Sequence, residues 1–532
     1  MRPLLHGFSL SRAALRKGCT AAVVASQLLI GLAPAGPAHA QLLPGMGDGG
    51  DMTVGAERRL GDQIVRELYR DPDFIDDPVL ADYVQGIWTR LLAAARVRGE
   101  LTPELDERFA WTLLLGRDRS INAFALPGGY LGLHLGLIAA TDSSDELATV
   151  LGHELSHVTQ RHIVRSMSKQ SRQMPLLLAA MVLGMVAAAK SRSGDAGQAV
   201  VMGTQAMAIQ SQLDYSRDME READRIGFGV MTQAGFAPEG AASMFEKLQY
   251  ASRLNDNGSY PYLRSHPLNT ERISDMQSRF QFAGASGRPP AVAPKMDHAL
   301  IAARARVLSR PGVDVLRQWI AASAPGGGDL ARMTPARQAA VLYAAALASV
   351  ELRELPAARA LAERLGPLAD ADPASARLAR LLAVEIELAA GTSDSAKKAV
   401  ALLGASSGPV SARSEMIFAA QAAIALRQPA PMVAPLRDWV ALHPRDALAW
   451  HTLANLHGAQ NDTLRAVRAD AEANVAVFDY AAARDRFKAA QALASQAGNG
   501  GAVDHYEASI IDTRARAIEA LWREQQEEKA AR

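Results

Sequence analysis

The stretch V-L-G-H-E-L-S-H-V-T at residues 150–159 decides how this chain folds and what chemistry it can hold. It contains the pattern H-E-x-x-H, with His153 and His157 four positions apart and Glu154 beside the first histidine. On an α-helix the two imidazoles lie one turn apart on one face, at a spacing that suits a zinc ion. The alternative is a surface helix that carries two histidines at this spacing by chance, and the surrounding sequence must decide between the two.

The chemistry of such a site is hydrolytic. Zinc held by two neutral imidazoles keeps a position for water and lowers the pKa of that water toward ~7. Glu154 lies next to this position and can take the proton as hydroxide attacks a carbonyl. Residues 146–151, E-L-A-T-V-L, have apolar positions at helical spacing and no proline, so we expect a largely buried helix here.

A third ligand is expected in the segment Y-S-R-D-M-E-R-E-A-D-R-I-G at residues 215–227. Glu220 and Asp224 are one helical turn apart, so Glu220 can reach the metal while Asp224 fixes a ligand histidine from behind. Glu222 is the competing ligand, but we expect it to point to the far side of the helix, where Ile226 is its neighbour. Glu220 is therefore the preferred ligand.

A site with three histidines does not fit the sequence. It needs glycine three residues and histidine six residues after the second histidine, and Gln160 and Ile163 stand at these positions. His162 is one residue out of place, and we expect it to face away as a solvated or capping histidine. The predicted centre is one Zn²⁺ per chain, held by His153, His157, Glu220 and water.

Four motifs resemble those of M48-family zinc metallopeptidases, in the same order along the chain. They are I-N-A-F-A-L-P-G-G-Y-L-G-L-H at 121–134, H-E-L-S-H-V-T-Q-R-H at 153–162, the 215–227 segment, and S-H-P-L-N-T-E-R-I at 265–273. The chain looks most like the periplasmic branch with C-terminal repeats, the β-barrel assembly-enhancing proteases. The specific motifs lie within residues 55–285, and the rest of the chain is similar only in architecture.

The resemblance implies a role for each site residue. It makes His153, His157 and Glu220 metal ligands, Glu154 the base, and Asp224 the partner of a ligand histidine. It also brings His266 to the metal as a regulatory ligand or as a donor to the transition state; without it, His266 would be an ordinary loop histidine before a proline. The implied substrates are unfolded or misassembled outer-membrane proteins, and the implied partner is the barrel-assembly machinery.

Residues 121–134 indicate an apolar strand, a Pro-Gly-Gly turn and a second strand that enters a helix. An edge strand beside the metal can bind an extended peptide through backbone hydrogen bonds, which would select unfolded segments. The alternative is a hairpin with a purely structural role.

The N-terminus has the pattern of a secretory signal peptide. Four basic residues precede the apolar run at 21–33, and an A-x-A site ends at Ala40. We therefore expect cleavage after Ala40 and a periplasmic protein. Removal of residues 1–40 takes four of the 57 Lys and Arg and none of the 56 Asp and Glu, which leaves a formal charge of −3. Nothing in this balance indicates a nucleic-acid partner.

A second apolar stretch, residues 175–189, is 15 residues long and short of the ~20 that a membrane-spanning helix needs. We expect a helix or lid over the cleft, with peripheral contact to lipid or to unfolded membrane protein as the alternative.

The C-terminal half follows a Pro-rich linker, G-R-P-P-A-V-A-P-K at 287–295, and is rich in alanine and leucine. Three segments have the spacing of tetratricopeptide repeat helices; an unspecified helical domain is the alternative. Stacked repeats form a concave surface, so this half is expected to bind substrates or partner proteins. The positions concerned are Leu355, Ala358, Ala362 and Leu365, then Tyr480, Ala483, Phe487 and Ala490, and Trp450, Leu453, Ala454 and His457.

Together these features predict an α+β, mostly α, zinc metallopeptidase domain followed by an all-α solenoid of the tetratricopeptide type. The predicted divisions are a signal peptide at 1–40, a flexible segment at 41–54, the peptidase domain at 55–285, the linker at 286–296 and the repeats at 297–525. The expected function is hydrolysis of peptide bonds in misfolded or stalled outer-membrane proteins. A periplasmic chaperone or scaffold that acts mainly through its repeats, with weak proteolysis, is the alternative.

Overall fold

The computed structural model describes residues 52–168, 217–253, 260–282, 295–324, 330–404, 412–497 and 504–530. The predicted signal peptide and the apolar stretch at 175–189 lie outside these ranges. Most of the predicted 41–54 segment and of the 286–296 linker lies outside them as well. Helix α2 (Val54–Tyr69) begins at the last residue of the predicted 41–54 segment. Helix α14 (Met296–Leu308) begins at the last residue of the predicted linker.

A four-stranded sheet in the order β1-β2-β4-β3 forms the centre of the N-terminal part. Strand β2 (Thr112–Gly116) pairs in parallel with β4 (Tyr130–His134), whereas β1 (Phe74–Ile75) and β3 (Ala123–Leu126) run antiparallel to their neighbours. Among the described residues, β3 has a strand on one side only, so it is an edge of the sheet.

The hairpin predicted from residues 121–134 is present as β3 and β4. Its turn needs glycine, because Gly128 and Gly129 adopt positive φ angles of 76° and 84°. Strand β4 then leads directly into helix α5 (Leu135–Ala140), as expected. The register pairs Ala125 with Leu131 and Ala123 with Leu133.

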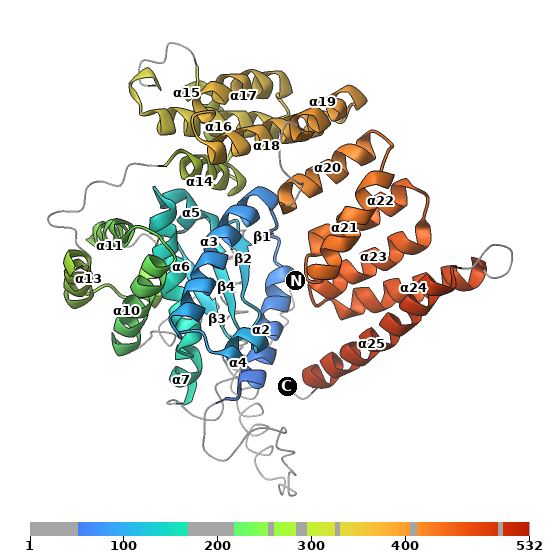
Figure 1. Cartoon of the computed structure of the whole chain (residues 1–532), viewed down its shortest axis with the longest axis horizontal. Coiled ribbons are helices and arrows are strands. Elements are labelled where there is room, and N and C mark those ends of the chain that lie inside the picture. The colour runs from blue at the N-terminus through green and yellow to red at the C-terminus, as the bar shows by residue number, and fades with distance from the viewer. Residues whose placement is uncertain are drawn as a thin grey trace, which may run out of the picture. The chain divides into compact units, whose positions relative to one another are not determined.

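The H-E-x-x-H motif lies on helix α6 (Ser144–Thr159), and residues 145–159 of this helix are all buried. The helix begins with Ser143, whose hydroxyl accepts a hydrogen bond from the backbone N–H of Glu146. It packs against β3 and against helices α3, α10 and α11 (Figure 1). This central position places the two histidines in the interior.

The described N-terminal part contains seven further helices. In chain order they are α3 (Pro78–Val97), α4 (Pro103–Arg108), α7 (His162–Ser168), α10 (Arg217–Gln233), α11 (Pro238–Arg253), α12 (Tyr262–Ser265) and α13 (Thr270–Phe282).

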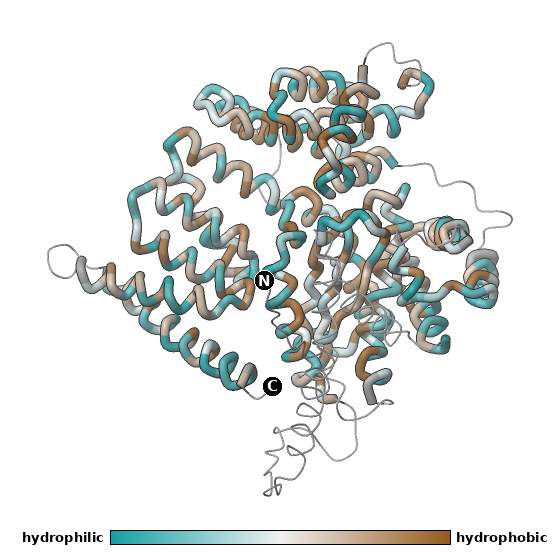
Figure 2. The backbone as a smooth tube through the Cα atoms, turned by 180° about the vertical axis from the view of Figure 1, so that it is seen from behind, coloured by the Kyte–Doolittle hydropathy of each residue, from teal (hydrophilic) through white to brown (hydrophobic). Residues whose placement is uncertain are grey.

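Every regular element that the structure describes in the C-terminal part is a helix, and from α15 onward successive helices pack as neighbours. Apolar and polar residues alternate along these helices (Figure 2), as in amphipathic helices that pack by one face. Three of them, α17, α22 and α24, contain the predicted repeat positions. The elements are α14, α15 (Val313–Ala322), a short 3₁₀ helix (Leu330–Arg332), α16 (Pro335–Glu351), α17 (Leu355–Ala369), α18 (Pro373–Ala389), α19 (Ser393–Gly404), α20 (Arg413–Ala425), α21 (Ala430–Leu442), α22 (Ala447–Ala459), α23 (Thr463–Ala476), α24 (Tyr480–Ala497) and α25 (His505–Ala530).

The two parts contact each other, because α14 packs on α5 and α20 packs on α3. The mostly helical structure with one small sheet confirms the predicted fold class at this level. None of the helices in the described ranges combines the length and the apolarity that crossing a membrane requires.

Candidate metal centre

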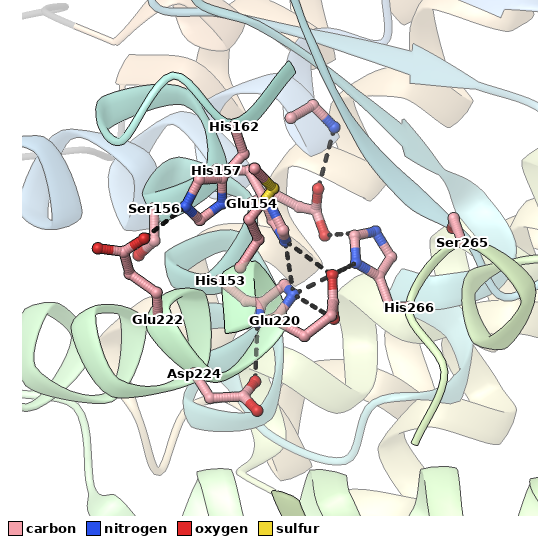
Figure 3. Close-up of polar contacts among 12 residues, drawn as sticks. His153, Glu154, Ser156, His157, His162, Glu220, Glu222, Asp224, Ser265 and His266 are labelled. Atoms are coloured by element: carbon pink, nitrogen blue, oxygen red, sulfur yellow. Dashed lines mark hydrogen bonds and ion pairs between the residues drawn. The ribbon is translucent and has the colours of Figure 1, made fainter. Parts of the chain in front are cut away.

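Two helices and one loop bring the candidate ligands together (Figure 3). Helix α6 contributes His153 and His157, α10 contributes Glu220, and His266 follows the short helix α12. All four side chains are buried, and one ligand atom from each lies within 4.8 Å of the others.

The donor atoms surround one small volume. His153 Nε2 lies 3.0 Å from His157 Nε2 and 3.5 Å from Glu220 Oε2, while His157 Nε2 lies 3.3 Å from Glu220 Oε1. Three imidazoles and a carboxylate form the kind of nitrogen and oxygen set that zinc prefers. Among the described residues, Glu154 Oε1 is buried and accepts no hydrogen bond, whereas Glu220 Oε2 is paired with Arg272 Nη1 at 2.8 Å. The donor set and the unsatisfied Glu154 oxygen beside it fit a site built for a cation.

His153 is held from behind by Asp224, as predicted for that residue. The His153 Nδ1 atom lies 2.9 Å from Asp224 Oδ1, which leaves Nε2 turned toward the other candidate ligands. Burial opposes protonation, but the hydrogen bonds to Asp224 and Glu220 outweigh it and raise the pKa of His153 to about 10. The two carboxylates therefore favour positive charge at this place, where a metal cation would bind.

His157 has the opposite tendency. Burial, only partly offset by the hydrogen bond with Glu220, lowers the pKa of His157 well below its ordinary value. The neutral imidazole is the form that binds a metal.

Glu154 lies beside the group and not within it. Its Oε2 accepts a hydrogen bond of 2.9 Å from the backbone N–H of Ala125 on β3, and its Oε1 lies 3.4 Å from His266 Nε2. Burial raises the pKa of Glu154 above its ordinary value, which makes the carboxylate a stronger base. The predicted position of β3 beside the site is confirmed by the contact with Ala125.

His266 is placed between the candidate base and the candidate third ligand. Its Nδ1 atom lies 3.1 Å from Glu220 Oε1 and 3.3 Å from His153 Nε2. Its ring stacks on Tyr262, with the ring centres 4.6 Å apart. The loop histidine predicted to approach the metal face is thus inside the group.

The prediction that His162 faces away is wrong. Its side chain is fully buried, and its Nδ1 atom lies 2.9 Å from His157 Nδ1. The helical geometry behind that prediction does not extend this far, because α6 ends at Thr159 and Arg161 adopts a left-handed φ of 52°. This turn directs His162, the first residue of α7, back toward His157.

Glu222 is outside the group of candidate ligands, yet it does not simply face away. Its Oε2 lies 3.0 Å from His162 Nε2 and accepts a hydrogen bond of 2.9 Å from Arg165 Nη1 (Figure 3 shows Glu222 and His162). Burial opposes ionisation, but these two partners outweigh it and lower the pKa of Glu222.

Arg272 is a further residue at the site that the sequence did not lead us to expect. It pairs with both oxygens of Asp224, at 2.6 and 2.8 Å, and its Nη1 lies 2.8 Å from Glu220 Oε2. Nη1 also donates to the carbonyl of Pro267, so Arg272 joins the His266 loop to α10. The signal was present: buried carboxylates need a cation, and Arg272 lies in the S-H-P-L-N-T-E-R-I motif.

An H-E-x-x-H helix, a third acidic residue one helix away and an edge strand beside the base define a zinc metallopeptidase. The model of peptidase family M48 matches residues 83–280. A relative from Vibrio cholerae is 35% identical over 63% of this chain and 66% of its own. The β-barrel assembly-enhancing proteases of Escherichia coli and Yersinia pestis are 32% and 31% identical over 68% and 83% of this chain and 70% and 86% of theirs. The chain belongs to the M48 zinc metallopeptidases, in the group of the β-barrel assembly-enhancing proteases.

Proposed function

We propose that this chain hydrolyses peptide bonds in unfolded or misassembled outer-membrane proteins in the periplasm. The observation that carries the proposal is the buried group of His153, His157, Glu220 and His266 beside a carboxylate, Glu154, that is bonded to an edge strand. The names of the relatives supply the class of substrate, and the signal-like N-terminus supplies the compartment.

In this proposal His153, His157 and Glu220 hold the zinc ion. Bound zinc supplies Lewis acidity, which lowers the pKa of water and polarises a substrate carbonyl. Glu154 takes the proton of the attacking water and delivers it to the leaving nitrogen. Its burial suits this task, because burial raises the pKa of Glu154 toward neutral pH, where a group that both accepts and donates a proton works best.

Strand β3 is the proposed binding place for the substrate backbone. The N–H of Ala125 points to Glu154 and therefore away from β4, so the outer edge of β3 faces the site. A peptide that adds to this edge would be recognised by its backbone, which favours extended, unfolded segments of many sequences.

The segment that contains His266 reaches the start of this edge. The N–H of Tyr262 donates to the carbonyl of Ile121, two residues before β3 begins. A substrate strand that extends to Ile121 would have to displace Tyr262 from this carbonyl. This arrangement supports the role of His266 as a latch that keeps the enzyme inactive; a donor to the transition state is the alternative role.

The C-terminal helices are proposed to be tetratricopeptide-like repeats that bind the barrel-assembly machinery or large substrates. Their support is the repeat spacing on α17, α22 and α24 and the names of the relatives. The predicted lid or membrane contact at 175–189 lies outside the described residues.

The test is degradation of an outer-membrane β-barrel protein by the zinc-loaded full chain. The substrate is offered either diluted from urea or already folded in detergent micelles, and Glu154→Gln serves as the control enzyme. We expect cleavage of the unfolded form only, and only by the unsubstituted enzyme. Equal fragments from Glu154→Gln, or an unfolded substrate that stays intact with the zinc-loaded enzyme, would contradict the proposal. Full rescue of a deletion strain by Glu154→Gln would favour the chaperone alternative.

A further inference from the structure

The two ring nitrogens of His157 face different partners among the described residues. Its Nε2 lies 3.0 Å from His153 Nε2 and 3.3 Å from Glu220 Oε1, so this atom is turned toward the proposed metal position. Its Nδ1 lies 2.9 Å from His162 Nδ1, on the other side of the ring. Two lone pairs would repel each other at this distance, so one of these two nitrogens must carry a proton.

Metal binding decides which nitrogen carries it. A ligand nitrogen offers its lone pair to the metal, so neutral His157 must carry its proton on Nδ1 and donate it to His162 Nδ1. His162 then carries its own proton on Nε2, which lies 3.0 Å from Glu222 Oε2. A carboxylate can only accept, so every N–H in the series meets an acceptor.

The opposite assignment fails at both ends. It places a proton on His157 Nε2, facing the metal position, and turns a lone pair of His162 Nε2 toward the carboxylate of Glu222. The second contact is repulsive, and the first blocks metal binding.

We propose that His162 and Glu222 are positioning residues that hold His157 in the tautomer and ring orientation that binds zinc. His162 is fully buried, and Arg165 Nη1 fixes Glu222 Oε2 at 2.9 Å. Each of the two histidines of H-E-x-x-H thus has its own carboxylate behind it. Asp224 acts directly on His153, whereas Glu222 acts on His157 through His162. The inference rests on the proposed role of His157 as a ligand.

Zinc affinity of the full chain, measured by competition with a chromophoric chelator, tests the inference without any substrate. Loss of an outer partner of a metal-binding histidine commonly costs about 10- to 100-fold in metal affinity, and we expect this loss for His162→Leu. His162→Asn should recover most of it, since an amide oxygen can stand in for the Nδ1 acceptor. Glu222→Ala should weaken binding as well, and the Co²⁺ absorption spectrum of both weakened variants should change.

The matched control is His298→Leu. His298 is another fully buried histidine, and its ring nitrogens contact Tyr83 and Thr141, away from the metal position. Its replacement should leave zinc affinity and the Co²⁺ spectrum unchanged, even if it lowers stability.

Three results would overturn the inference. One is zinc affinity in His162→Leu and Glu222→Ala that matches the unsubstituted chain or His298→Leu. Another is full zinc binding by His157→Ala, which would also remove the ligand role on which the inference rests. If His162→Leu does not fold, Glu222→Ala decides, because the Glu222 side chain is 29% exposed and tolerates truncation better. The third contradicting result is therefore an unchanged zinc affinity of Glu222→Ala.

Discussion

His266 contacts both the proposed base and the proposed third ligand, and this double contact sets its expected role. Its Nε2 faces Glu154 Oε1 at 3.4 Å, and its Nδ1 faces Glu220 Oε1 at 3.1 Å. In the proposed latch role, His266 would hold the place that water and a substrate carbonyl need. Tyr262 of the same segment is bonded to Ile121 just before β3, so release of His266 would also free this end of the strand.

Replacement of His266 by alanine should therefore raise activity on a short unfolded peptide at saturating zinc. An enzyme that is closed about 90% of the time would gain about tenfold when the closed state is removed. If His266 instead donates to the transition state, the same change should lower turnover by roughly 10²- to 10³-fold. The control is His451→Ala, which should leave the rate unchanged. His451 lies on α22, and its side chain is half-exposed. A rate equal to that control at equal zinc affinity would make His266 an ordinary loop residue.

Residue spacing along single helices led to His153, His157, Glu220 and Asp224 as a set, and the structure brings these four together. The same spacing gave a wrong orientation for His162, because Arg161 has a left-handed backbone conformation. No residue in the motif indicates a turn at this position. Arg272 was missed although it lies in a motif, because it approaches from a separate helix and the motif does not say which carboxylates it pairs with.

Helices α6 and α10 cross at two glycines, and this crossing positions the site. A Cβ atom added at Gly227 would lie 2.9 Å from the backbone N of His153, and one at Gly152 would lie 3.1 Å from the Gly227 carbonyl oxygen. Only backbones without side chains can approach so closely. The close crossing allows Glu220 and Asp224 on α10 to reach the histidines of α6.

We expect Gly227→Ala to push the two helices apart by a few tenths of an ångström. Overpacking of this kind commonly costs about 1 to 3 kcal/mol of stability, and the displaced Glu220 should weaken zinc binding by roughly tenfold. Gly86→Ala is the matched control, because a Cβ at Gly86 meets no atom within 4 Å and alanine favours the helix by up to about 1 kcal/mol. Zinc competition and urea unfolding measure both effects. Equal zinc affinity in the two variants would show that the crossing does not control the site.

Local patterns were enough to predict the β3–β4 hairpin and the buried helix α6. Pro127 and the two glycines mark the turn, and the apolar positions before His153 mark the helix. The pairing of β2 with β4 in parallel was not predicted, since it depends on residues far apart in the chain. The repeat spacing indicated helices in the C-terminal half, but not where they dock on the N-terminal part.

Three arginines join the two parts of the chain around the start of α3. Each bridges an acidic residue at 76–82 to an acidic residue of the C-terminal helices. Arg304 joins Asp77 to Glu385, Arg377 joins Asp82 to Glu415, and Arg413 joins Asp76 to Asp446. The described residues from 52 to 530 accordingly belong to one compact unit, in which the proposed peptidase and repeat regions are packed together.

Arg304→Met should lower the free energy of unfolding by about 3 to 5 kcal/mol, because it leaves buried Asp77 without its cation. Arg304 donates to both oxygens of Asp77, at 2.8 and 2.6 Å, and is 1% exposed. Adding Asp77→Asn should restore part of the loss. Arg437→Met breaks an exposed pair with Asp438 and should cost less than about 1 kcal/mol. Urea unfolding curves compare the variants. Similar midpoints for Arg304→Met and Arg437→Met would contradict the stabilising role of Arg304 between the two parts.

The central claim is that one zinc ion, held by His153, His157 and Glu220 and served by Glu154 as the base, performs peptide hydrolysis. It is tested most directly by zinc content and cleavage rate measured together on the full chain, Glu154→Gln and Glu220→Gln. We expect one zinc per chain in the first two, with the rate of Glu154→Gln lower by about 10²- to 10⁴-fold. Glu220→Gln should lose the metal, since a neutral amide is a poor ligand. Near-normal cleavage by Glu154→Gln, or stoichiometric zinc in Glu220→Gln, would contradict the claim.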